Sequence, residues 1–400
     1  MNIQNARASQ IKMSPSMSVS MAAQALRARG ETVIDLSLGE PDFDTPPHVI
    51  EAAIAAMRGG VTRYTGPAGT QALRTAIAGK FKRENELDYA ADEIAVANGA
   101  KQIIFNAFLA TLEPGDEVIV PAPYWVSYTD IALLHGGVPR IVTCGVEAGF
   151  KMSPAQLQAA LTNRTRWLFL NSPSNPTGAV YSRAEFEALG AVLRRHPRVI
   201  ILSDEIYEHI VAAEGRFVSF ADACPDLRDR TLLVNGVSKA YAMTGWRLGY
   251  AAGPKPLIAA LNKMQSQSTT CPSSISQAAA AAALDGPQSF VIEANAEYTA
   301  RGKLVTDGLN AIAGLKTASP MGAFYAFPEC SAFIGRRSPD GRTITSDTDL
   351  ATYLLNHGKV ATVPGAAFGL EPYLRLSFAT SRETLQIAIA GIASALADLR

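Results

Sequence analysis

The sequence has no excess of charge of either sign and few cysteines. Its 36 Lys and Arg residues balance 36 Asp and Glu residues, so the formal net charge at pH 7 is +0. This balance argues against nucleic acid or an anionic membrane as a partner. The four cysteines lie far apart, with no C-x-x-C spacing and no histidine cluster, so we expect free thiols, a reducing cytoplasm and no metal centre.

Long apolar runs, repeats and low-complexity linkers are also missing. Residues 1–24 lack the uninterrupted apolar stretch of a signal peptide. No segment approaches the roughly 20 apolar residues of a membrane-spanning helix. Hydrophobic residues make up 48% of the 400 residues and charged residues 18%, which is typical of a chain with a sizeable buried core. We therefore expect a soluble cytoplasmic protein.

Between about residues 46 and 250, strand-like apolar runs alternate with helical patterns. Strands separated by helices imply βαβ crossovers and a largely parallel sheet. Ligands bind outside the carboxyl ends of the strands in such sheets. We therefore expect the polar residues that follow the runs to converge in one cleft, namely Gly99 to Lys101, Asn171 to Gly178, Asp204 to Tyr207, and Ser238 with Lys239.

After residue 254 the pattern changes. A helical region to about residue 310 precedes strand-like segments at 322–327, 361–369 and 373–379 and a closing helix from Ser381. A few strands with helices on one face indicate a smaller α+β domain. The sequence thus predicts an α/β fold in which 46–290 form a large domain with a mostly parallel sheet flanked by helices. Residues 291–400 form the small domain, and 1–45 form an N-terminal arm and part of the small domain.

The segment at 234–250, VNGVSKAYAMTGWRLGY, places two cations, Lys239 and Arg247, among small, aromatic and apolar residues. A lysine with its ordinary pKa of about 10.4 is uncharged in fewer than roughly one molecule in a thousand at neutral pH. A nucleophilic role therefore needs a site that stabilises the neutral or imine form, and pyridoxal phosphate is the commonest aldehyde partner of such lysines. The alternative is a snorkelling surface lysine.

Three polar residues at the expected cleft fit the ring of such a cofactor. Asp204 directly follows a buried strand, where a carboxylate needs a cation such as a protonated pyridine nitrogen; a helix N-cap is the alternative. Tyr207 could hydrogen-bond the phenolic oxygen of the ring or simply pack. Asn175, in a loop with two prolines, could donate to the same oxygen or belong to an ordinary turn.

Phosphate requires donors, and a helix start supplies them. Gly99, Ala100 and Lys101 open a helix after a strand, so their backbone N–H groups form an anion site. Arg247 could clamp the same phosphate in bidentate fashion, although most arginines make surface ion pairs.

Arg375 lies in a strand-like run of the second domain. Because successive strand side chains alternate, it could face the cleft and bind a substrate α-carboxylate while Leu374 and Leu376 face a core. Trp125, in PAPYWVSY, could stack on a flat ring or fill the core.

Taken together, these segments resemble the fold-type I, class I pyridoxal-phosphate aminotransferases, most closely the bacterial aspartate aminotransferase branch. The resemblance spans nearly the whole chain in the same order. Its motifs are S-K-x-x-x-x-x-G-W-R at 238–247, N-P-T-G at 175–178, D-E-x-Y at 204–207, Y-x-x-x-x-G-x-x-x-L-R at 64–74, GEPDFDTP at 39–46, and the late Arg375.

The resemblance implies pyridoxal 5'-phosphate as cofactor and a role for each matched residue. Lys239 would form an imine with the cofactor and later move the substrate α-proton as general base and acid. Tyr64 would reach across from a second subunit, which implies an obligate homodimer with shared sites. The remaining cofactor-binding residues would be Asp204 at the pyridine nitrogen, Asn175 and Tyr207 at the phenolic oxygen, Trp125 on the ring, and Gly99, Ala100, Lys101 and Arg247 at the phosphate.

The implied substrate-binding residues are Gly39, Trp125, Asn175 and Arg375, and two departures from the family pattern bear on the rest. Many members carry a serine phosphate ligand three residues before the lysine, whereas this chain has Gly236, so Ser238 is the expected substitute. The segment 265–277 contains no arginine for a distal carboxylate. In bacterial relatives with aspartate and prephenate activity a lysine of the N-terminal arm is implicated, which is Lys12 here; a solvated arm lysine is the alternative.

The resemblance therefore implies transfer of the amino group of L-aspartate to 2-oxoglutarate, with prephenate or aromatic compounds as further substrates. The alternatives are an aromatic or other amino-acid aminotransferase, or a carbon–sulfur lyase on the same fold. A regulatory or binding protein with this fold would be expected to lack Lys239, Asp204 or Arg375, and all three are present.

Overall fold

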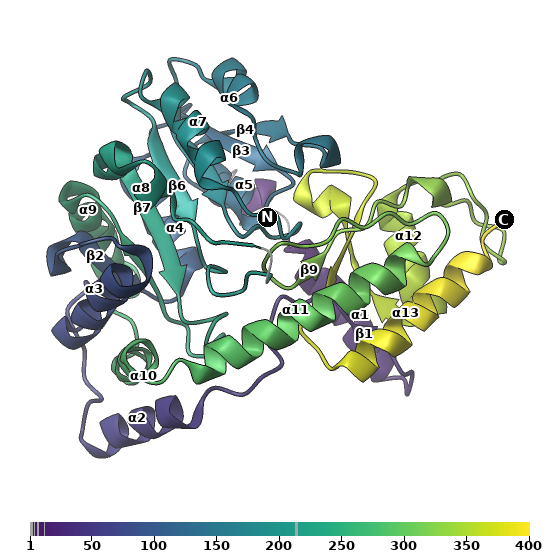
Figure 1. Ribbon diagram of the computed structural model, residues 1–400, viewed down its shortest axis with the longest axis horizontal. Coiled ribbons are helices and arrows are strands. Elements are labelled where there is room, and N and C mark those ends of the chain that lie inside the picture. Colours follow the sequence, from purple (N-terminus) through teal and green to yellow (C-terminus); the bar gives the residue numbers. More distant parts are fainter. Residues whose placement is uncertain (1–2, 4, 6–7, 12, 213–214) are drawn as a thin grey trace.

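A computed structural model describes residues 3, 5, 8–11, 13–212 and 215–400. Figure 1 shows a large part built around one sheet and a smaller part that contains the C-terminal helices and the described N-terminal segment. The long helix α11 (Ser289–Asn310) runs from the large part into the small one. The predicted division into 1–45, 46–290 and 291–400 stays a prediction. Its second boundary falls inside the first turn of α11.

The large sheet has seven strands in the order β2-β8-β7-β6-β5-β3-β4. All neighbouring pairs are parallel except those that β8 makes with β2 and β7, so the largely parallel sheet predicted above is confirmed. Its strands are β2 (Ile94–Ala97), β3 (Glu117–Ala122), β4 (Val138–Thr143), β5 (Thr165–Asn171), β6 (Ile200–Asp204), β7 (Thr231–Gly236) and β8 (Gly249–Ala252).

Helices cover both faces of this sheet because alternate strand residues are apolar on both sides. On β5, Trp167 and Phe169 pack towards α4, α5 and α9, while Leu168 and Leu170 pack towards α6, α7 and α8. Helices α2, α3 and α10 cover the end of the sheet at β2 and β8. The helices are α2 (Pro47–Arg58), α3 (Gln71–Asn85), α4 (Ala100–Thr111), α5 (Ser127–Leu134), α6 (Pro154–Ala160), α7 (Arg183–Leu193), α8 (Phe220–Ala223), α9 (Lys255–Ser266) and α10 (Ser274–Asp285).

Local signals set several of these helix ends. Helix α2 has Pro47 at its first position and Gly59 at its C-cap, as expected from the sequence. At the start of α7, Ser182 and Glu185 form a capping box, which satisfies two backbone N–H groups. The predicted helical region between 254 and 310 is confirmed as three helices, α9, α10 and α11.

The small part packs α11, α12 (Asp347–Tyr353) and α13 (Arg382–Ala397) with two short sheets. One sheet has the order β11-β12-β9, from Val363–Pro364, Leu374–Ser377 and Tyr325–Ala326, and the other pairs β1 (Ile34–Asp35) with β10 (Val360–Ala361). Helix α1 (Pro15–Arg27) lies beside them. Short 3-10 helices span Ala8–Gln10, Ala91–Glu93, Val146–Ala148, Pro225–Arg230, Ser331–Phe333 and Gly365–Phe368, and a π-helix spans Leu354–Gly358.

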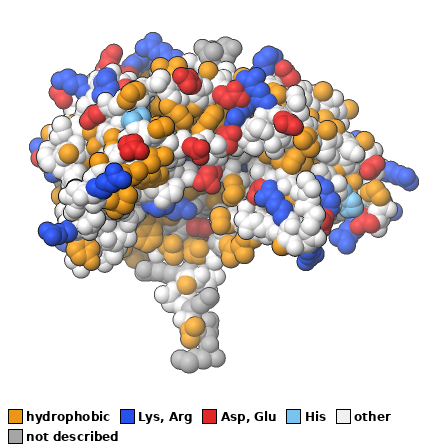
Figure 2. All heavy atoms as spheres, turned by 90° about the horizontal axis from the view of Figure 1, so that it is seen from below, with side chains coloured by type: hydrophobic (Ala, Val, Ile, Leu, Met, Phe, Trp, Pro, Cys, Tyr) orange, Lys and Arg blue, Asp and Glu red, His pale blue; other side chains and the backbone are white. Residues whose placement is uncertain are grey.

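The surface and the cysteines agree with the composition. Figure 2 shows one face of the molecule, seen from below relative to Figure 1, on which Lys and Arg side chains are interspersed with Asp and Glu. The four cysteines are free thiols, as predicted. Among the described residues, no helix is long and apolar enough to cross a membrane.

Candidate active site

A cavity of about 320 Å³ lies at the carboxyl ends of the parallel strands, where the large sheet meets the small part. The convergence follows from the topology, because Asn171 and Asp204 end adjacent parallel strands and pair with each other. The cavity is lined by eleven of the residues predicted from sequence, Gly39, Ala100, Lys101, Trp125, Asn175, Asp204, Tyr207, Ser238, Lys239, Arg247 and Arg375.

Lys239 lies half-buried in the turn after β7. Its Nζ donates to the backbone oxygen of Gly39 at 2.6 Å. The pKa of Lys239 is lowered to about 8, chiefly by burial. The positive charges of Arg375 and Arg247 contribute to this decrease, whereas the negative charge of Glu40 opposes it. At pH 7 about one amine in ten is then neutral, compared with one in a few thousand for an ordinary lysine. The site therefore raises the fraction of the neutral, nucleophilic amine by more than a hundredfold, although the charged form still predominates at pH 7.

Asp204 is the last residue of β6 and is 4% exposed. Its Oδ2 accepts a hydrogen bond from the Tyr128 hydroxyl at 2.7 Å, and Oδ1 accepts one from the Ile206 N–H at 3.3 Å. Burial raises the pKa of Asp204 to about 6, although these hydrogen bonds and the charge of Lys239 oppose the rise. Asp204 is followed by a turn at 206–209 and no helix begins there, so the N-cap alternative is wrong. A cation bound beside this carboxylate would lower its pKa and further favour the ionised form.

Asn175 and Tyr207 are held from different sides of the cavity. The backbone N–H of Asn175 donates to Asn171 Oδ1 at 2.9 Å, and its own Oδ1 accepts from Arg375 Nη1 at 3.1 Å. The Tyr207 hydroxyl oxygen is 2.7 Å from that of Tyr325. Each side chain is thus fixed by a neighbour while it lines the cavity.

Arg375 is a buried cation, and within the described part of the chain it has no carboxylate partner. It is 3% exposed and donates to the neutral oxygens of Asn175, Ser37 and Ser16. Burial lowers its pKa from the ordinary value. Among the described residues, no carboxylate forms an ion pair with it. Its strand neighbours Leu374 and Leu376 lie in the core of the small part, so the predicted alternation is confirmed.

The start of helix α4 is shaped for close approach. Gly99 is the N-cap residue with φ of 90°, and a Cβ there would lie 2.6 Å from Arg247 Nη2. The guanidinium of Arg247 donates to the Thr244 carbonyl oxygen at 3.0 Å and lies next to Gly99, where the helix begins. Burial, assisted by Arg247, lowers the pKa of Lys101, which lies 4.9 Å from the centroid of the Trp125 ring. These groups form a cationic corner suited to phosphate.

Gly236, where many family members have serine, is the last residue of β7 and pairs with Gly249 of β8. A Cβ at Gly236 would lie 3.1 Å from the Cα of Gly249 and from the Leu248 oxygen, and a Cβ at Gly249 would lie 2.2 Å from the Ala100 nitrogen. The close pairing of β7 with β8 therefore favours glycine at position 236, and the packing of β8 against the start of α4 requires it at position 249.

Two predicted residues of the described chain, Gly99 and Tyr64, are not among those that line the cavity. The Gly99 N–H donates to the Ala97 oxygen at 2.7 Å, so this group is not available to a phosphate. Tyr64 is 89% exposed. Lys12 lies outside the described residues, although Ser14 and Ser16 of the same arm line the cavity.

The sequence analysis missed two tyrosines of the site. Tyr128 bonds to Asp204 and stacks on Phe169, and Tyr325 bonds to Tyr207. Both are 2% exposed or less, and both lie in segments that read as core. Only a hydroxyl among apolar neighbours could have identified them, because a buried tyrosine hydroxyl usually has a partner.

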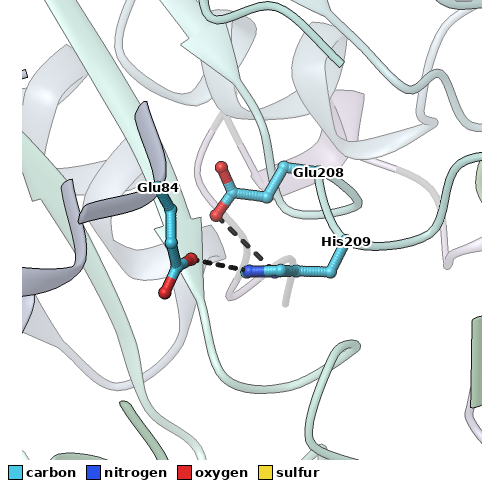
Figure 3. A group of neighbouring side chains, drawn as sticks. All are labelled: Glu84, Glu208 and His209. Atoms are coloured by element: carbon cyan, nitrogen blue, oxygen red, sulfur yellow. Dashed lines mark hydrogen bonds and ion pairs between the residues drawn. The ribbon is translucent and has the colours of Figure 1, made fainter. Parts of the chain in front are cut away.

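A second group of titratable side chains lies away from the cavity. Figure 3 shows Glu84, Glu208 and His209 directed toward one another. One carboxylate oxygen from each glutamate and one ring nitrogen of the histidine lie within 4.8 Å of one another. Lys80, fully buried, forms ion pairs with both carboxylates. Its ammonium group faces both carboxylates, Arg83 adds an ion pair to Glu84 at 2.9 Å, and Asn85 adds a hydrogen bond to Glu208 at 2.9 Å.

The geometry can be compared with known proteins. Residues 31–392 match the family described as aminotransferase class I and II. The chain is 53% identical over 389 residues to an aspartate aminotransferase of Rhizobium meliloti (strain 1021), covering 97% of this chain and 95% of that relative. It is 50% identical over 392 residues to an aspartate/prephenate aminotransferase of Nitrosomonas europaea, covering 98% of each.

Solved structures agree. The crystal structure of the aspartate aminotransferase from Rhizobium meliloti has a TM-score of 0.97 at 52% identity and covers 100% of both chains. That of the Thermus thermophilus aspartate aminotransferase with maleate has a TM-score of 0.92 at 42% identity, covering 99% of this chain and 100% of the other. These likenesses confirm the predicted fold type, and the chain belongs to the class I and II aminotransferase family of enzymes.

Proposed function

We propose that this enzyme uses pyridoxal 5'-phosphate to transfer the amino group of L-aspartate to 2-oxoglutarate, giving oxaloacetate and L-glutamate. One observation carries the substrate class: Arg375 is a buried guanidinium without a carboxylate partner among the described residues, in the same cavity as Lys239. A buried cation without a counter-ion is costly, and the α-carboxylate of an amino acid supplies one in matching geometry. Relatives named aspartate or aspartate/prephenate aminotransferase support the aspartate assignment.

The residues present fit each functional group of the cofactor. Lys239 offers an amine with a lowered pKa, and Asp204 offers a buried carboxylate for a protonated pyridine nitrogen. The start of α4 and Arg247 offer donors to a phosphate, with the ring of Trp125 nearby. When bound, pyridoxal phosphate supplies an aldehyde that condenses with amines and a ring that withdraws electrons from the substrate α-carbon.

Proton transfer falls to Lys239. A general base must be neutral before it accepts a proton, and a pKa of about 8 makes the neutral form accessible at physiological pH. Its Nζ takes the proton from Cα of the bound amino acid. Arg375 holds the α-carboxylate, and the Asn175 side chain that accepts from Arg375 keeps the guanidinium in place.

The distal carboxylate of aspartate requires a further cation. In the described part of the cavity the cations are Lys101, Lys239, Arg247 and Arg375, and each already has a proposed partner. We assign the distal carboxylate to Lys12, because Ser14 of the same arm reaches the cavity wall. A charge-assisted contact is worth about 1.5–3 kcal/mol, which corresponds to roughly 10- to 150-fold in preference.

We further propose a homodimer in which Tyr64 completes the site of the partner. Tyr64 is 89% exposed, and Met57 and Val61, just before it in the chain, are 47% and 44% exposed. Exposed apolar side chains grouped in this way are typical of an interface. In such a dimer Tyr64 would contact the ligand bound in the partner's site, and the partner would cover the exposed side chains of Met57 and Val61.

The test is a substrate panel followed through the visible absorbance of the protein loaded with pyridoxal phosphate. We expect aspartate and glutamate each to abolish the visible band, and Lys239→Ala to prevent its formation. Prephenate should restore the band after aspartate if it is a further amino acceptor. A band that responds to aromatic amino acids but not to aspartate would favour the aromatic aminotransferase instead.

Lys12→Ala tests the distal contact. We expect about 10-fold or greater loss of kcat/KM for aspartate and little change for alanine, which has no distal carboxylate. Equal losses on both substrates would show that the arm does not recognise this group.

A further inference from the structure

Tyr325 is a cavity residue to which no role has been assigned. It is the first residue of β9, pairs with Ser377 of β12 and is 1% exposed. Three residues with proposed roles meet it: Gly39 from the segment after β1, Tyr207 from the turn after β6, and Arg375 from β12. These residues belong to separate segments of the chain, so the position of Tyr325 bears on all of them.

The hydroxyl of Tyr325 occupies the space beside Gly39. A Cβ at Gly39 would lie 2.1 Å from Tyr325 Oη, so this hydroxyl requires glycine at position 39. The carbonyl oxygen of Gly39 accepts from Lys239 Nζ at 2.6 Å. The Tyr325 hydroxyl therefore lies between the backbone of Gly39, which contacts Lys239, and the hydroxyl of Tyr207, whose oxygen is 2.7 Å away.

The bond between the two tyrosines gains a direction once a ligand is bound. A phenolic hydroxyl has one proton to donate. When Tyr207 donates its proton to the phenolic oxygen of the cofactor, the bond must run from the Tyr325 O–H to the Tyr207 oxygen. Hydrogen bonds in such a chain strengthen one another, by about 10–30% per bond. The Tyr325 hydroxyl thus holds Tyr207 in the donor role.

The ring of Tyr325 acts on a different group. The guanidinium carbon of Arg375 lies 4.6 Å from the centroid of this ring and 4.9 Å from that of Phe368. Two aromatic faces therefore support the cation, and this contact is stronger in a desolvated site. Because Arg375 has no ion-paired carboxylate among the described residues, the two rings add to the support that it receives from the oxygens of Asn175, Ser37 and Ser16.

We propose that Tyr325 is a positioning residue with two separable contributions. Its hydroxyl directs the Tyr207 proton to the phenolic oxygen of the cofactor, and its ring directs Arg375 to the substrate carboxylate. The inference rests on the proposed function, since it assumes a ring oxygen at Tyr207 and an α-carboxylate at Arg375.

The hydroxyl is tested by the pH midpoint of the visible absorbance change of the loaded protein. Donors to the phenolic oxygen favour its ionised form and so lower this midpoint. We expect Tyr207→Phe to raise the midpoint and Tyr325→Phe to raise it by a smaller amount, a few tenths of a pH unit. The double variant should match Tyr207→Phe alone, because the Tyr325 hydroxyl acts through Tyr207. An unchanged midpoint in Tyr325→Phe, or full additivity in the double variant, would overturn the assignment.

The ring is tested by comparing Tyr325→Leu with Tyr325→Phe. Loss of the ring should raise KM for aspartate about 2- to 30-fold with a smaller effect on kcat, whereas Tyr325→Phe should keep KM within about twofold. Equal KM values for the two variants would refute the role of the ring. Circular dichroism and the amount of bound cofactor establish that each variant is folded. A wild-type protein without a visible band refutes the proposed function itself, whereas a normal wild type with an unaffected Tyr325→Phe refutes only the role of the Tyr325 hydroxyl.

Discussion

Replacing Lys80 by methionine is expected to destabilise the protein strongly, although Lys80 does not line the cavity. Methionine keeps most of the aliphatic volume and removes the charge. In the wild type, Lys80 Nζ forms ion pairs with Glu208 and Glu84 and donates to Asn85 Oδ1 at 2.8 Å. The substitution therefore leaves a buried carboxylate, 3% exposed at Glu208, without its principal cation.

The magnitude follows from the groups that remain. Removing one partner of a buried ion pair costs about 3–5 kcal/mol, because the other charge stays buried. Glu208 still accepts hydrogen bonds from the side-chain nitrogens of Asn85 and Asn235, each at 2.9 Å, so we expect the lower end, about 3 kcal/mol. This is a large share of the roughly 5–15 kcal/mol that stabilises a typical domain.

Urea unfolding at fixed protein concentration measures the change. The matched control is Lys82→Met, an exposed lysine on the same helix, for which we expect a change within about 0.5 kcal/mol. Adding Glu208→Gln to Lys80→Met removes the orphaned charge and should recover part of the loss. The reasoning is refuted if Lys80→Met behaves like Lys82→Met, or if the double variant is no more stable than Lys80→Met.

The cluster of Lys80, Glu84, Glu208 and His209 also determines how the stability of the fold should change with pH. Burial raises the pKa of Glu84, but the hydrogen bond from His209 and the charge of Lys80 outweigh it and bring the pKa down to about 2. The pKa of Glu208 is also lowered, because Lys80 outweighs its burial. A carboxyl with a depressed folded-state pKa stabilises the protein above its unfolded pKa of about 4.5 and loses that contribution as pH falls. The difference between wild type and Lys80→Met should therefore narrow from pH 4.5 towards pH 2.

Three further predictions concern the site. Arg375→Lys keeps the charge but loses the planar fork, so KM for aspartate should rise about 10- to 150-fold with an unchanged cofactor band; an unaltered KM in steady-state assays would place the carboxylate elsewhere. Gly236→Ser would crowd Gly249 and Leu248 at 3.1 Å and should lower the free energy of unfolding by about 1–3 kcal/mol in urea titrations, and a neutral result would show that β8 can yield. Uptake of pyridoxal phosphate by the apo protein, followed by stopped-flow absorbance, should accelerate with pH up to about pH 8 and then level off, because only neutral Lys239 reacts; a rate independent of pH would contradict its lowered pKa.

The cavity residues that local pattern identified share one property. Asp204 and Lys239 each follow a buried strand, and parallel strands bring their carboxyl ends to one edge of a sheet. Arg375 stands between two leucines in a strand, and alternation places it opposite them. Burial, element type and strand direction are encoded over a few residues, so the sequence by itself determined the fold class and most of the cavity wall.

What the tertiary structure decided is which side chains meet. Tyr128 and Tyr325 read as core residues, and only the packing shows that their hydroxyls contact Asp204 and Tyr207. Glu208, the buried carboxylate partner of Lys80, is 128 residues away in the chain, so no local pattern could reveal this pair. The pKa of a buried group likewise depends on charges and hydrogen bonds from distant segments, because electrostatic energy depends on separation in space and on loss of water rather than on separation in the chain.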